Sequence, residues 1–301
     1  MTQTWFHAPG NGIRRGAMRL TGAAGAAFFL AALLPAAPAG AQEKKWSVVR
    51  IATEGAFRPW NFSNPDGSLD GYEIELHKIL CDQMKVECIV SVQSFDGMIP
   101  ALNVGKFDAI MSGMSATAKR EEAIAFSTSY GSTGQTFGVL RTGALANFPG
   151  GGDVFSLSGD EAGAIKALAG MQPALQGRII GVQSSTIAAA FLDKYLKGVV
   201  EVREYKTTEQ HDLDLIAGRL DMIMASASYL SAAAARPGNA DITVVGPRFQ
   251  GGILGRGSSI GLRKSDPELK ALFDAAIAAA KADGTITRLS QKWFGFDITP
   301  R

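Results

Sequence analysis

A single arginine, Arg120, closes a run of small and hydroxyl-bearing residues, MSGMSATAKR, where the pattern predicts the start of a helix. Small residues let the backbone approach a ligand and present its N–H groups, and Thr117 followed by Glu121 or Glu122 resembles a loosely spaced helix cap. Backbone N–H groups beside a guanidinium suit an anion such as a carboxylate. The alternative is a strand-to-helix turn with a solvated arginine, because most charges at helix starts lie on the surface.

The first 41 residues are typical of a secretory signal peptide. Three arginines and no acid come first, the apolar run TGAAGAAFFLAALL follows, and Ala39-Gly40-Ala41 fits a small-x-small cleavage site. An uncleaved membrane anchor is the alternative, but the apolar run is shorter than the roughly 20 residues that span a bilayer. We therefore expect export and cleavage, with Met1 or Met18 as the true start.

The charge of the chain depends on this segment. Removing residues 1–41 lowers the formal net charge from +2 to −1, because the segment holds Arg14, Arg15 and Arg19 and no acidic residue. No basic face then remains to suggest nucleic acid as a partner. No later segment approaches the length of a transmembrane helix, so the sequence predicts a protein that is soluble outside the inner membrane.

The chain has only two cysteines, Cys81 and Cys88, in the segment LCDQMKVECIV. An even pair in an exported protein favours a disulfide, and two free buried thiols are the alternative. A metal site is not expected, because there are only three histidines, His7, His77 and His211, and the first lies in the leader.

Strand and helix patterns alternate from residue 46 onward, which predicts an α/β protein with a largely parallel sheet. The first series of expected elements comprises strands at 46–54 and 86–92, helices at 71–84 and about 96–105, and a strand through 110. A glycine-rich loop at 147–160 precedes the second series. Its expected elements, alternately strand and helix, are 178–183, 185–196, 201–205, 209–220, 221–226 and 228–235.

The final helices, within 266–294, have no obvious place in the second series, so we expect them to pack on the first. Extended crossings near 134–140 and 242–247 would then join two lobes as a hinge, and a hinge between lobes creates a cleft. The expected segments are 1–41 for the signal peptide, 47–137 and 246–301 for the first lobe, and 138–245 for the second.

The segment GYEIELHKILCDQM (71–84) resembles the signature of the family 3 bacterial extracellular solute-binding proteins. Further motifs match in order along 47–298, namely SFDGMIPAL, KFDAIMSGMSATAKR, GVQSST, AGRLD and DGTITRLSQKWF. The resemblance implies an α/β, type II periplasmic-binding-protein fold with two lobes joined by a two-strand hinge. It also implies that the protein hands its ligand to an inner-membrane ABC permease.

Within this family the sequence resembles the polar amino acid and opine branch. IATEGAFRPWNFS, FLDKYLKG and the insertion at 147–176 are similar to octopine- and nopaline-binding proteins. Histidine-binding and lysine/arginine/ornithine-binding proteins are also similar, and they carry a disulfide that matches Cys81 and Cys88.

The resemblance assigns a role to Arg120. In these relatives the matching arginine binds the ligand carboxylate, helped by the hydroxyl and N–H of the residue that matches Ser115. An N–H at the position of Ile187, in the same loop as Thr186, completes the anion site. Ile187 replaces a usual threonine, which keeps the N–H and removes a hydroxyl.

The same resemblance places a cationic head group near Glu54, which ends the first strand where relatives that bind basic amino acids carry an acid. A surface glutamate is the alternative. Phe57, Trp60 and Phe95 belong to the same expected pocket, and two aromatic rings can hold a guanidinium through cation–π contacts of ~0.5 to 2 kcal/mol. We favour Phe57 and Phe95 for this contact, because Trp60 is more typical of a core residue.

Ser226 departs from the pattern of amino-acid binders, which place an aspartate there to neutralise the ligand ammonium. A buried ammonium without a counter-charge would cost several kcal/mol. The serine therefore argues against tight capture of a free α-amino acid and favours a secondary amine beside a second carboxylate, as in an opine. The remaining expected contacts are Ser112 and Gly113, with Gln183, Ser184 and His211 as weaker candidates that are more typical of structural residues.

These features predict a monomeric periplasmic binding protein for an opine or another arginine-derived cationic compound. A cationic L-amino acid (arginine, lysine, ornithine or histidine) is the alternative ligand. No cofactor and no catalysis are expected. The rival from another class is a periplasmic dehydratase of the cyclohexadienyl type on the same fold, for which Glu54 is the one evident acid–base candidate.

Overall fold

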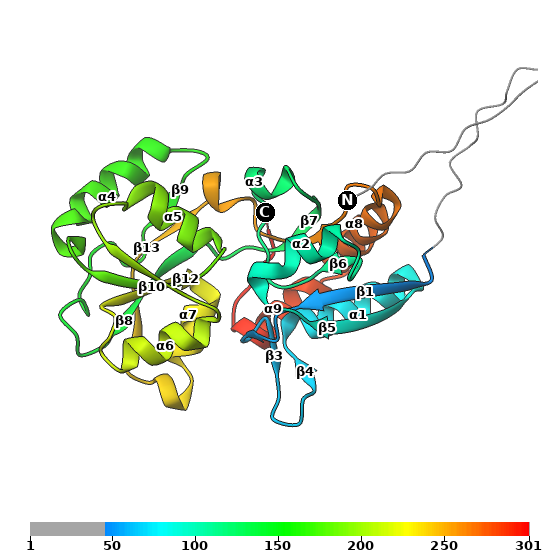
Figure 1. Ribbon diagram of the computed structural model, residues 1–301, viewed down its shortest axis with the longest axis horizontal. Helices are drawn as coiled ribbons and strands as arrows, with labels where there is room; N and C mark the ends of the chain where they lie inside the picture. The colour runs from blue at the N-terminus through cyan, green and yellow to red at the C-terminus, as the bar shows by residue number, and fades with distance from the viewer. Residues whose placement is uncertain (1–45, 301) are drawn as a thin grey trace, which may run out of the picture. The chain divides into compact units, whose positions relative to one another are not determined.

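The computed structural model describes residues 46–300, in which helices and strands alternate along the chain (Figure 1). The predicted signal peptide, residues 1–41, lies outside the described residues. The described strands form a five-stranded sheet, a six-stranded sheet and a small three-stranded sheet. Helices surround each larger sheet, so the fold consists of two α/β lobes.

The first lobe contains the five-stranded sheet, whose strands are β1 (Val48–Thr53), β5 (Glu87–Val92), β6 (Ala109–Ile110), β7 (Ala125–Gly131) and β14 (Ser258–Leu262). Their order across the sheet is β5-β1-β6-β14-β7. β1 pairs parallel with β5 and β6, whereas β14 pairs antiparallel with β6 and β7. Its helical segments are α1 (Tyr72–Met84), η1 (Phe95–Gly97), α2 (Met98–Asn103), α3 (Ala118–Glu121), α8 (Pro267–Ala282) and α9 (Thr285–Phe294).

The C-terminal helices α8 and α9 pack on α1 and so return the chain to the first lobe. Leu76 of α1, Phe273 of α8 and Leu289 of α9 are fully buried in one core. The disulfide between Cys81 and Cys88 joins α1 to β5, which confirms the predicted pairing. The small sheet of this lobe consists of β2 (Ala56–Phe57), β3 (Asn61–Ser63) and β4 (Leu69–Asp70).

The second lobe contains the six-stranded sheet, whose strands are β8 (Gln135–Leu140), β9 (Val154–Ser156), β10 (Ile179–Gln183), β11 (Glu201–Tyr205), β12 (Met222–Ser226) and β13 (Ile242–Gln250). Their order is β11-β10-β12-β8-β13-β9. Its helical segments are α4 (Glu161–Leu175), α5 (Ile187–Tyr195), α6 (Thr208–Ile216), α7 (Ala227–Ala234), η2 (Pro237–Asn239) and η3 (Gly252–Leu254). β8 pairs antiparallel with both β12 and β13, so this sheet is mixed rather than largely parallel.

Strands β8 and β13 carry the chain into and out of the second lobe. The predicted lobe boundaries, between 137 and 138 and between 245 and 246, fall inside these strands. Both strands pair within the second sheet from end to end, since Gln135 lies opposite Ser226 and Phe249, and Leu140 lies opposite Ile242. A division before 135 and after 254 keeps both strands and η3 within the second lobe, and the exact boundaries stay a prediction.

The second lobe also holds two elements that the sequence patterns did not predict. β9 lies inside the expected glycine-rich loop, and α4 follows it. Helix α4 contains Gly163, Gly170 and Pro173, which weaken its helical pattern. Its N-terminus is nevertheless capped, because the Asp160 side chain accepts a hydrogen bond from Gly163 N. Leu168 and Leu175 then bury its inner face in the core of the second lobe.

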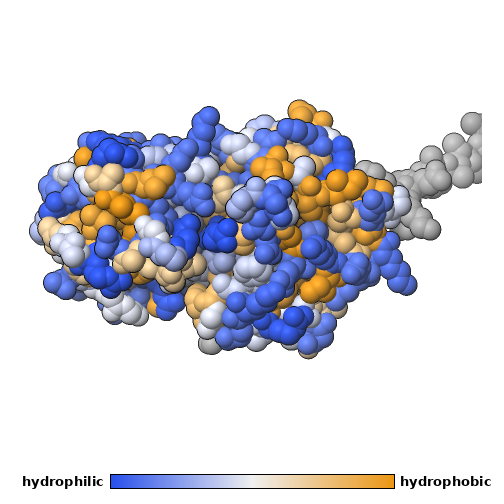
Figure 2. Space-filling view, turned by 90° about the horizontal axis from the view of Figure 1, so that it is seen from below, coloured by the Kyte–Doolittle hydropathy of each residue, from blue (hydrophilic) through white to orange (hydrophobic). Residues whose placement is uncertain are grey.

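Hydrophilic residues predominate on the face drawn in Figure 2, where apolar side chains gather in separate patches. Within residues 46–300, no helix combines the length and the apolar character needed to cross a bilayer. The same residues contain no cluster of histidine, cysteine and acidic side chains that could hold a metal ion.

Candidate functional site

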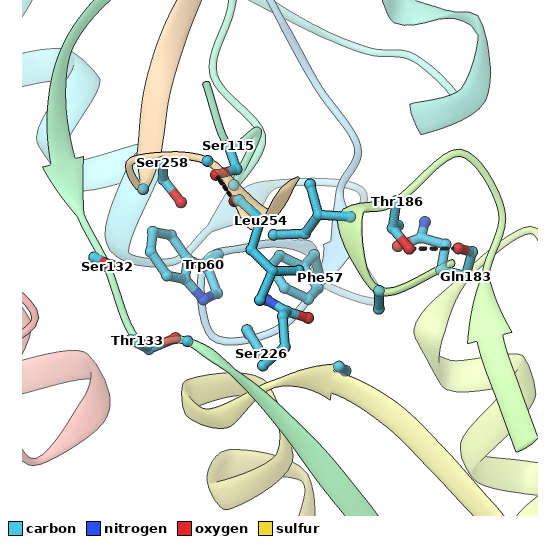
Figure 3. A pocket seen from close by; sticks show the side chains of 18 of the residues that line it. Phe57, Trp60, Ser115, Ser132, Thr133, Gln183, Thr186, Ser226, Leu254 and Ser258 are labelled. Carbon is cyan, nitrogen blue, oxygen red and sulfur yellow. Dashed lines mark hydrogen bonds between the residues drawn. The ribbon is translucent and has the colours of Figure 1, made fainter. Parts of the chain in front are cut away.

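One cavity is lined by residues of both lobes and, with its open mouth, encloses about 800 Å³ (Figure 3). The eleven main ligand contacts predicted from the sequence all line it. They are Glu54, Phe57, Trp60, Phe95, Ser112, Gly113, Ser115, Arg120, Thr186, Ile187 and Ser226. The structure thus brings together residues from β1 to the end of β12, although their role in binding a ligand stays a prediction.

Arg120 is held between the lobes by backbone oxygens. It lies in the short helix α3, whose N-cap Thr117 accepts a hydrogen bond from Arg120 N at 3.2 Å. Its guanidinium donates to Ser115 O at 2.9 Å in its own lobe and to Ser185 O at 2.9 Å in the second lobe. Burial lowers the pKa of Arg120 to about 10, which still leaves the side chain cationic at neutral pH.

The N-terminus of α5 faces the cavity beside this arginine, since Thr186, Ile187 and Ala188 all line it. Thr186 caps the helix by accepting from Ala189 N at 3.3 Å, and its hydroxyl donates to Gln183 O at 2.7 Å. The first backbone N–H groups of a helix lack partners within the helix and favour an anion. A guanidinium and a helix N-terminus therefore lie together at one end of the cavity, and both favour an anion.

The hydroxyl of Ser115 has a partner within the protein. The resemblance implied that its hydroxyl binds the ligand carboxylate, but the Ser115 hydroxyl donates to Leu254 O at 2.7 Å (Figure 3). A serine hydroxyl has only one proton to donate. In this arrangement, Ser115 can donate a hydrogen bond to an anion only through its backbone N–H.

Glu54 is the acid of the cavity and is only 6% exposed. Its carboxylate accepts a hydrogen bond from Gln183 Nε2 in the second lobe, and its backbone N–H donates to Ser112 Oγ at 3.0 Å. Burial raises the pKa of Glu54 to about 7, against the opposing effect of the Gln183 hydrogen bond. Three nearby acids raise this pKa further, namely Glu209, Glu73 and Asp96.

Gly113 makes room for the ring of Phe57. Its φ of +60° suits glycine, and a Cβ at this position would lie 2.9 Å from Phe57 Cε1. A buried acid fixes the loop, because Glu73 Oε1 accepts from Gly113 N at 2.7 Å and from the Tyr130 hydroxyl. The small residue predicted beside the ligand therefore also shapes the aromatic wall of the cavity.

Phe57 and Phe95 each contact a different side chain. The Phe95 ring centroid lies 5.6 Å from Arg120 Cζ, and the Phe57 ring stacks on Tyr229 of the second lobe with centroids 5.3 Å apart. Trp60 lines the cavity but is only 2% exposed, and its Nε1 donates to Ser228 Oγ at 3.0 Å. The predicted holding of a guanidinium between Phe57 and Phe95 therefore stays a prediction.

Ser226 ends β12 and caps α7, because its hydroxyl accepts from Tyr229 N at 3.3 Å. Among residues 46–300, no acid lines the cavity at this point. Of the weaker candidates, Gln183 lines the cavity, whereas Ser184 does not belong to its lining. His211 is fully buried in the second lobe, with Nδ1 3.1 Å from Asp212 Oδ1.

Sequence reasoning missed the residues of the two segments that join the lobes. Both segments line the cavity, one through Ser132, Thr133 and Gln135 and the other through Gln250 and residues between 251 and 258 (Figure 3). The predicted crossing near 134–140 overlaps the first of these segments, whereas the one near 242–247 stops short of the second. Thr208 of α6 also lines the cavity and had no sequence signal.

The chain is similar to two known binding proteins. The octopine-binding periplasmic protein of Rhizobium meliloti is 45% identical over 301 residues, which cover 94% of this chain and 100% of the relative. The L-arginine-binding protein of Pseudomonas aeruginosa is 34% identical over 83% of this chain and 89% of its own length. These relatives are binding proteins rather than enzymes.

A solved structure extends the comparison to the fold. A periplasmic His/Glu/Gln/Arg/opine family-binding protein from Silicibacter pomeroyi, in complex with lysine, is 32% identical with a TM-score of 0.66. The match covers 83% of this chain and 99% of that chain. The fold is thus the type II periplasmic-binding-protein fold. Because the family pattern matches residues 49–296, the chain belongs to the bacterial extracellular solute-binding proteins, family 3.

Proposed function

We propose that this chain is a periplasmic binding protein of an ABC importer and that it captures an opine or another arginine-derived cationic compound. One observation carries the proposal: among the described residues that line the cavity, Arg120 and Glu54 are the two ionisable ones. A small molecule with a carboxylate at one end and a cationic head group at the other complements this pair of charges.

The anionic end of the ligand would bind at Arg120 and the N-terminus of α5. A guanidinium can pair with a carboxylate through two parallel hydrogen bonds, and helix N–H groups can satisfy the remaining lone pairs. Arg120 belongs to the first lobe and α5 to the second, so a carboxylate bound here would contact both lobes. Only a ligand that binds the closed form more tightly than the open form can favour closure.

The cationic end would bind near Glu54, with Phe57 and Phe95 as the nearby aromatic residues. At neutral pH a bound cation would favour the ionised form of the Glu54 carboxyl group, whose pKa is raised to about 7 by burial. Gln183 already donates to this carboxylate. The ligand cation would thus join an existing contact between the lobes.

Ser226 favours an opine over a free α-amino acid. A primary ammonium beside this neutral residue would be buried without a counter-charge. The secondary amine of an opine carries a second carboxylate nearby, which neutralises it within the ligand. The octopine-binding relative supports this assignment.

A cationic L-amino acid is the second candidate. The arginine-binding relative and the lysine complex of the Silicibacter pomeroyi protein favour it. Both candidates place a carboxylate at Arg120 and a cation at Glu54, so they differ mainly at Ser226.

We further propose that residues 1–41 are removed during export, and that the mature protein acts as a periplasmic monomer that delivers an unchanged ligand to an inner-membrane permease. The periplasmic relatives support the compartment. Glu54 serves here as a charge partner rather than as an acid–base catalyst. Product formation from prephenate or arogenate, followed by absorbance, would contradict this assignment.

Isothermal titration calorimetry with octopine, arginine and lysine tests the proposed ligand. We expect octopine to bind more tightly than arginine, and Glu54→Gln to weaken both. Glu204→Gln is the matched control, because Glu204 is exposed on β11, away from the cavity. Tighter binding of arginine than of octopine would select the second candidate, and no heat with any of the three would reject both.

A further inference from the structure

Tyr229 joins the lobes without lining the cavity. It lies in the first turn of α7, and its ring is almost parallel to that of Phe57, at 8°, with centroids 5.3 Å apart. Phe57 belongs to the first lobe and lines the cavity. Its ring also stacks on Trp60 at 6.2 Å, and Trp60 Nε1 donates to Ser228 Oγ at 3.0 Å. Two successive residues of α7 therefore hold the aromatic wall that the first lobe contributes.

A partly buried ionic cluster holds the hydroxyl of Tyr229. Asp212 Oδ2 accepts three hydrogen bonds, from the Tyr229 hydroxyl at 2.7 Å, Arg236 Nη2 at 2.8 Å and Asn239 Nδ2 at 3.1 Å. Tyr229 is fully buried and Asp212 is 2% exposed. Arg236 also lies over the tyrosine ring, with Cζ 5.5 Å from its centroid. Charge-assisted hydrogen bonds at low dielectric constant restrict the tyrosine to one geometry.

Phe57 is confined from both lobes. Gly113 of the first lobe leaves no space beside its ring, because a Cβ there would lie 2.9 Å from Phe57 Cε1. Tyr229 covers the ring from the second lobe. The stack joins the two lobes through protein side chains alone, so it exists only while the lobes are in contact. Contacts of this kind favour the closed form of a hinged protein before binding, which raises its apparent affinity.

We propose that Tyr229 is a positioning residue that holds the Phe57 ring in the cavity wall across the lobe boundary and favours lobe contact in the ligand-free protein. The effect on affinity rests on the proposed function, whereas the effect on lobe contact does not. An aromatic pair shifts an equilibrium by roughly 2- to 12-fold beyond the burial of its area. That range is the expected loss of affinity when the ring is removed.

Tyr229→Leu removes the stack, and Tyr229→Phe keeps the ring while it removes the hydrogen bond to Asp212. Tyr205→Leu is the matched control, because Tyr205 packs on His211 inside the second lobe and donates its hydroxyl to Asp214. Small-angle X-ray scattering of the ligand-free proteins should give a larger radius of gyration for Tyr229→Leu than for wild type. Tyr205→Leu should match wild type, and Tyr229→Phe, which keeps the ring but loses its hydrogen bond to Asp212, should lie between wild type and Tyr229→Leu.

Calorimetry with octopine and arginine supplies the second readout, including the double variant Phe57→Leu/Tyr229→Leu. We expect Tyr229→Leu to weaken binding about 2- to 12-fold and to cost nothing further once Phe57 is leucine. Unchanged scattering of Tyr229→Leu, an equal change in Tyr205→Leu, or fully additive losses in the double variant would overturn the proposal. If Tyr229→Leu does not fold, Phe57→Leu removes the same stack and its scattering decides. If neither compound binds wild type, the proposed function fails, while the scattering still decides the role of Tyr229.

Discussion

At the scale of single residues, the cavity contains one group that stays charged and one that titrates near neutral pH. Arg120 remains cationic because burial lowers its pKa only to about 10. Glu54 is different, because burial raises its pKa to about 7. Binding of a carboxylate at Arg120 should therefore depend little on pH around neutrality, and binding of a cation at Glu54 should depend on it strongly.

Replacement of Arg120 tests the proposed binding site of the ligand carboxylate. Arg120→Ala should weaken binding of octopine or arginine by ~2 to 5 kcal/mol, because the ligand carboxylate would be buried without its partner. Calorimetry at pH 7.5 measures the loss. Arg219→Ala is the control, since Arg219 forms an exposed ion pair with Asp214. An affinity equal to that of wild type would remove Arg120 from the site.

The affinity for a cationic head group should rise as the pH increases through about 7, the pKa to which burial raises Glu54. The carboxyl group loses its proton over this range and gains a charge that attracts the ligand cation. Titrations of arginine at pH 6, 7 and 8 measure the trend in wild type and in Glu54→Gln. The glutamine variant should lose the trend, and the same slope in both proteins would contradict the role of Glu54.

The stability of the ligand-free protein should show the opposite trend. The folded-state pKa of Glu54 lies above its ordinary value of 4.5, so between pH 4.5 and about 7 the folded form binds more protons than the unfolded form. Rising pH then lowers the free energy of unfolding, and the loss is complete above the folded-state pKa. Glu54→Gln should be more stable than wild type at pH 8 by up to about 3 kcal/mol, but not at pH 4.5.

Urea unfolding at the two pH values measures this difference. Glu204→Gln, at an exposed position, should show no such difference. Equal stability of wild type and Glu54→Gln at pH 8 would mean that the buried carboxyl group carries no unfavourable charge.

At the scale of elements, two helix N-termini of the second lobe reach the cavity with different chemistry. Thr186 caps α5 beside Arg120, and Ser226 caps α7 at the end of β12. The α5 end can receive a carboxylate through its free N–H groups. At the α7 end, the Ser226 hydroxyl accepts from Tyr229 N, which gives the cavity a neutral residue there.

Ser226→Asp tests the selectivity of the α7 end. Aspartate is as good an N-cap as serine, so the helix should persist while the cavity gains a negative charge. Binding of arginine should improve relative to octopine, because a primary ammonium gains a partner and a second carboxylate meets repulsion. Competition calorimetry with both compounds measures the ratio. Ser226→Asn is the matched neutral control, and a ratio that moves towards octopine would contradict the account of this position.

Local sequence patterns predicted the elements in which apolar residues repeat regularly toward the core. Helix α1 repeats Leu76 and Leu80 toward the core, and its disulfide partner Cys88 lies on the next strand. Helix α4 was missed because its glycines and Pro173 hide a helix that tertiary packing stabilises. The boundaries of the lobes depend on the pairing of β8 with β13, which is a contact between distant segments that no local pattern contains.

The candidate site could likewise be predicted only in part, because local signals identify residues but not their distant partners. Arg120 and Glu54 stand at element ends and could be predicted from residue type and family motifs. The partners of these residues could not, because Gln183 and Ser185 reach them from the other lobe. The Ser115 hydroxyl was assigned to the ligand, whereas the distant chain segment at Leu254 receives its proton.

At the scale of the whole molecule, the described lobes meet on more than one side of the cavity. The Arg120 guanidinium reaches Ser185 O at one contact, and Trp60 reaches Ser228 at another. A ligand in the cavity would add its own contacts to these contacts between the lobes. Lobe closure therefore combines a contribution from the protein with one from the ligand.

Ligand binding should stabilise both lobes together, because the cavity lining comes from both. A ligand that binds only the folded form adds about 2.7 kcal/mol to the free energy of unfolding at a concentration 100 times its Kd. Differential scanning calorimetry with octopine should show the heat absorption of the whole protein moving to higher temperature, by several degrees for a protein of this size. Arg120→Ala at the same octopine concentration should show a much smaller shift, and Arg219→Ala should shift as wild type does. If only part of the heat absorption moved, octopine would contact a single lobe, and a site shared between the lobes would be excluded.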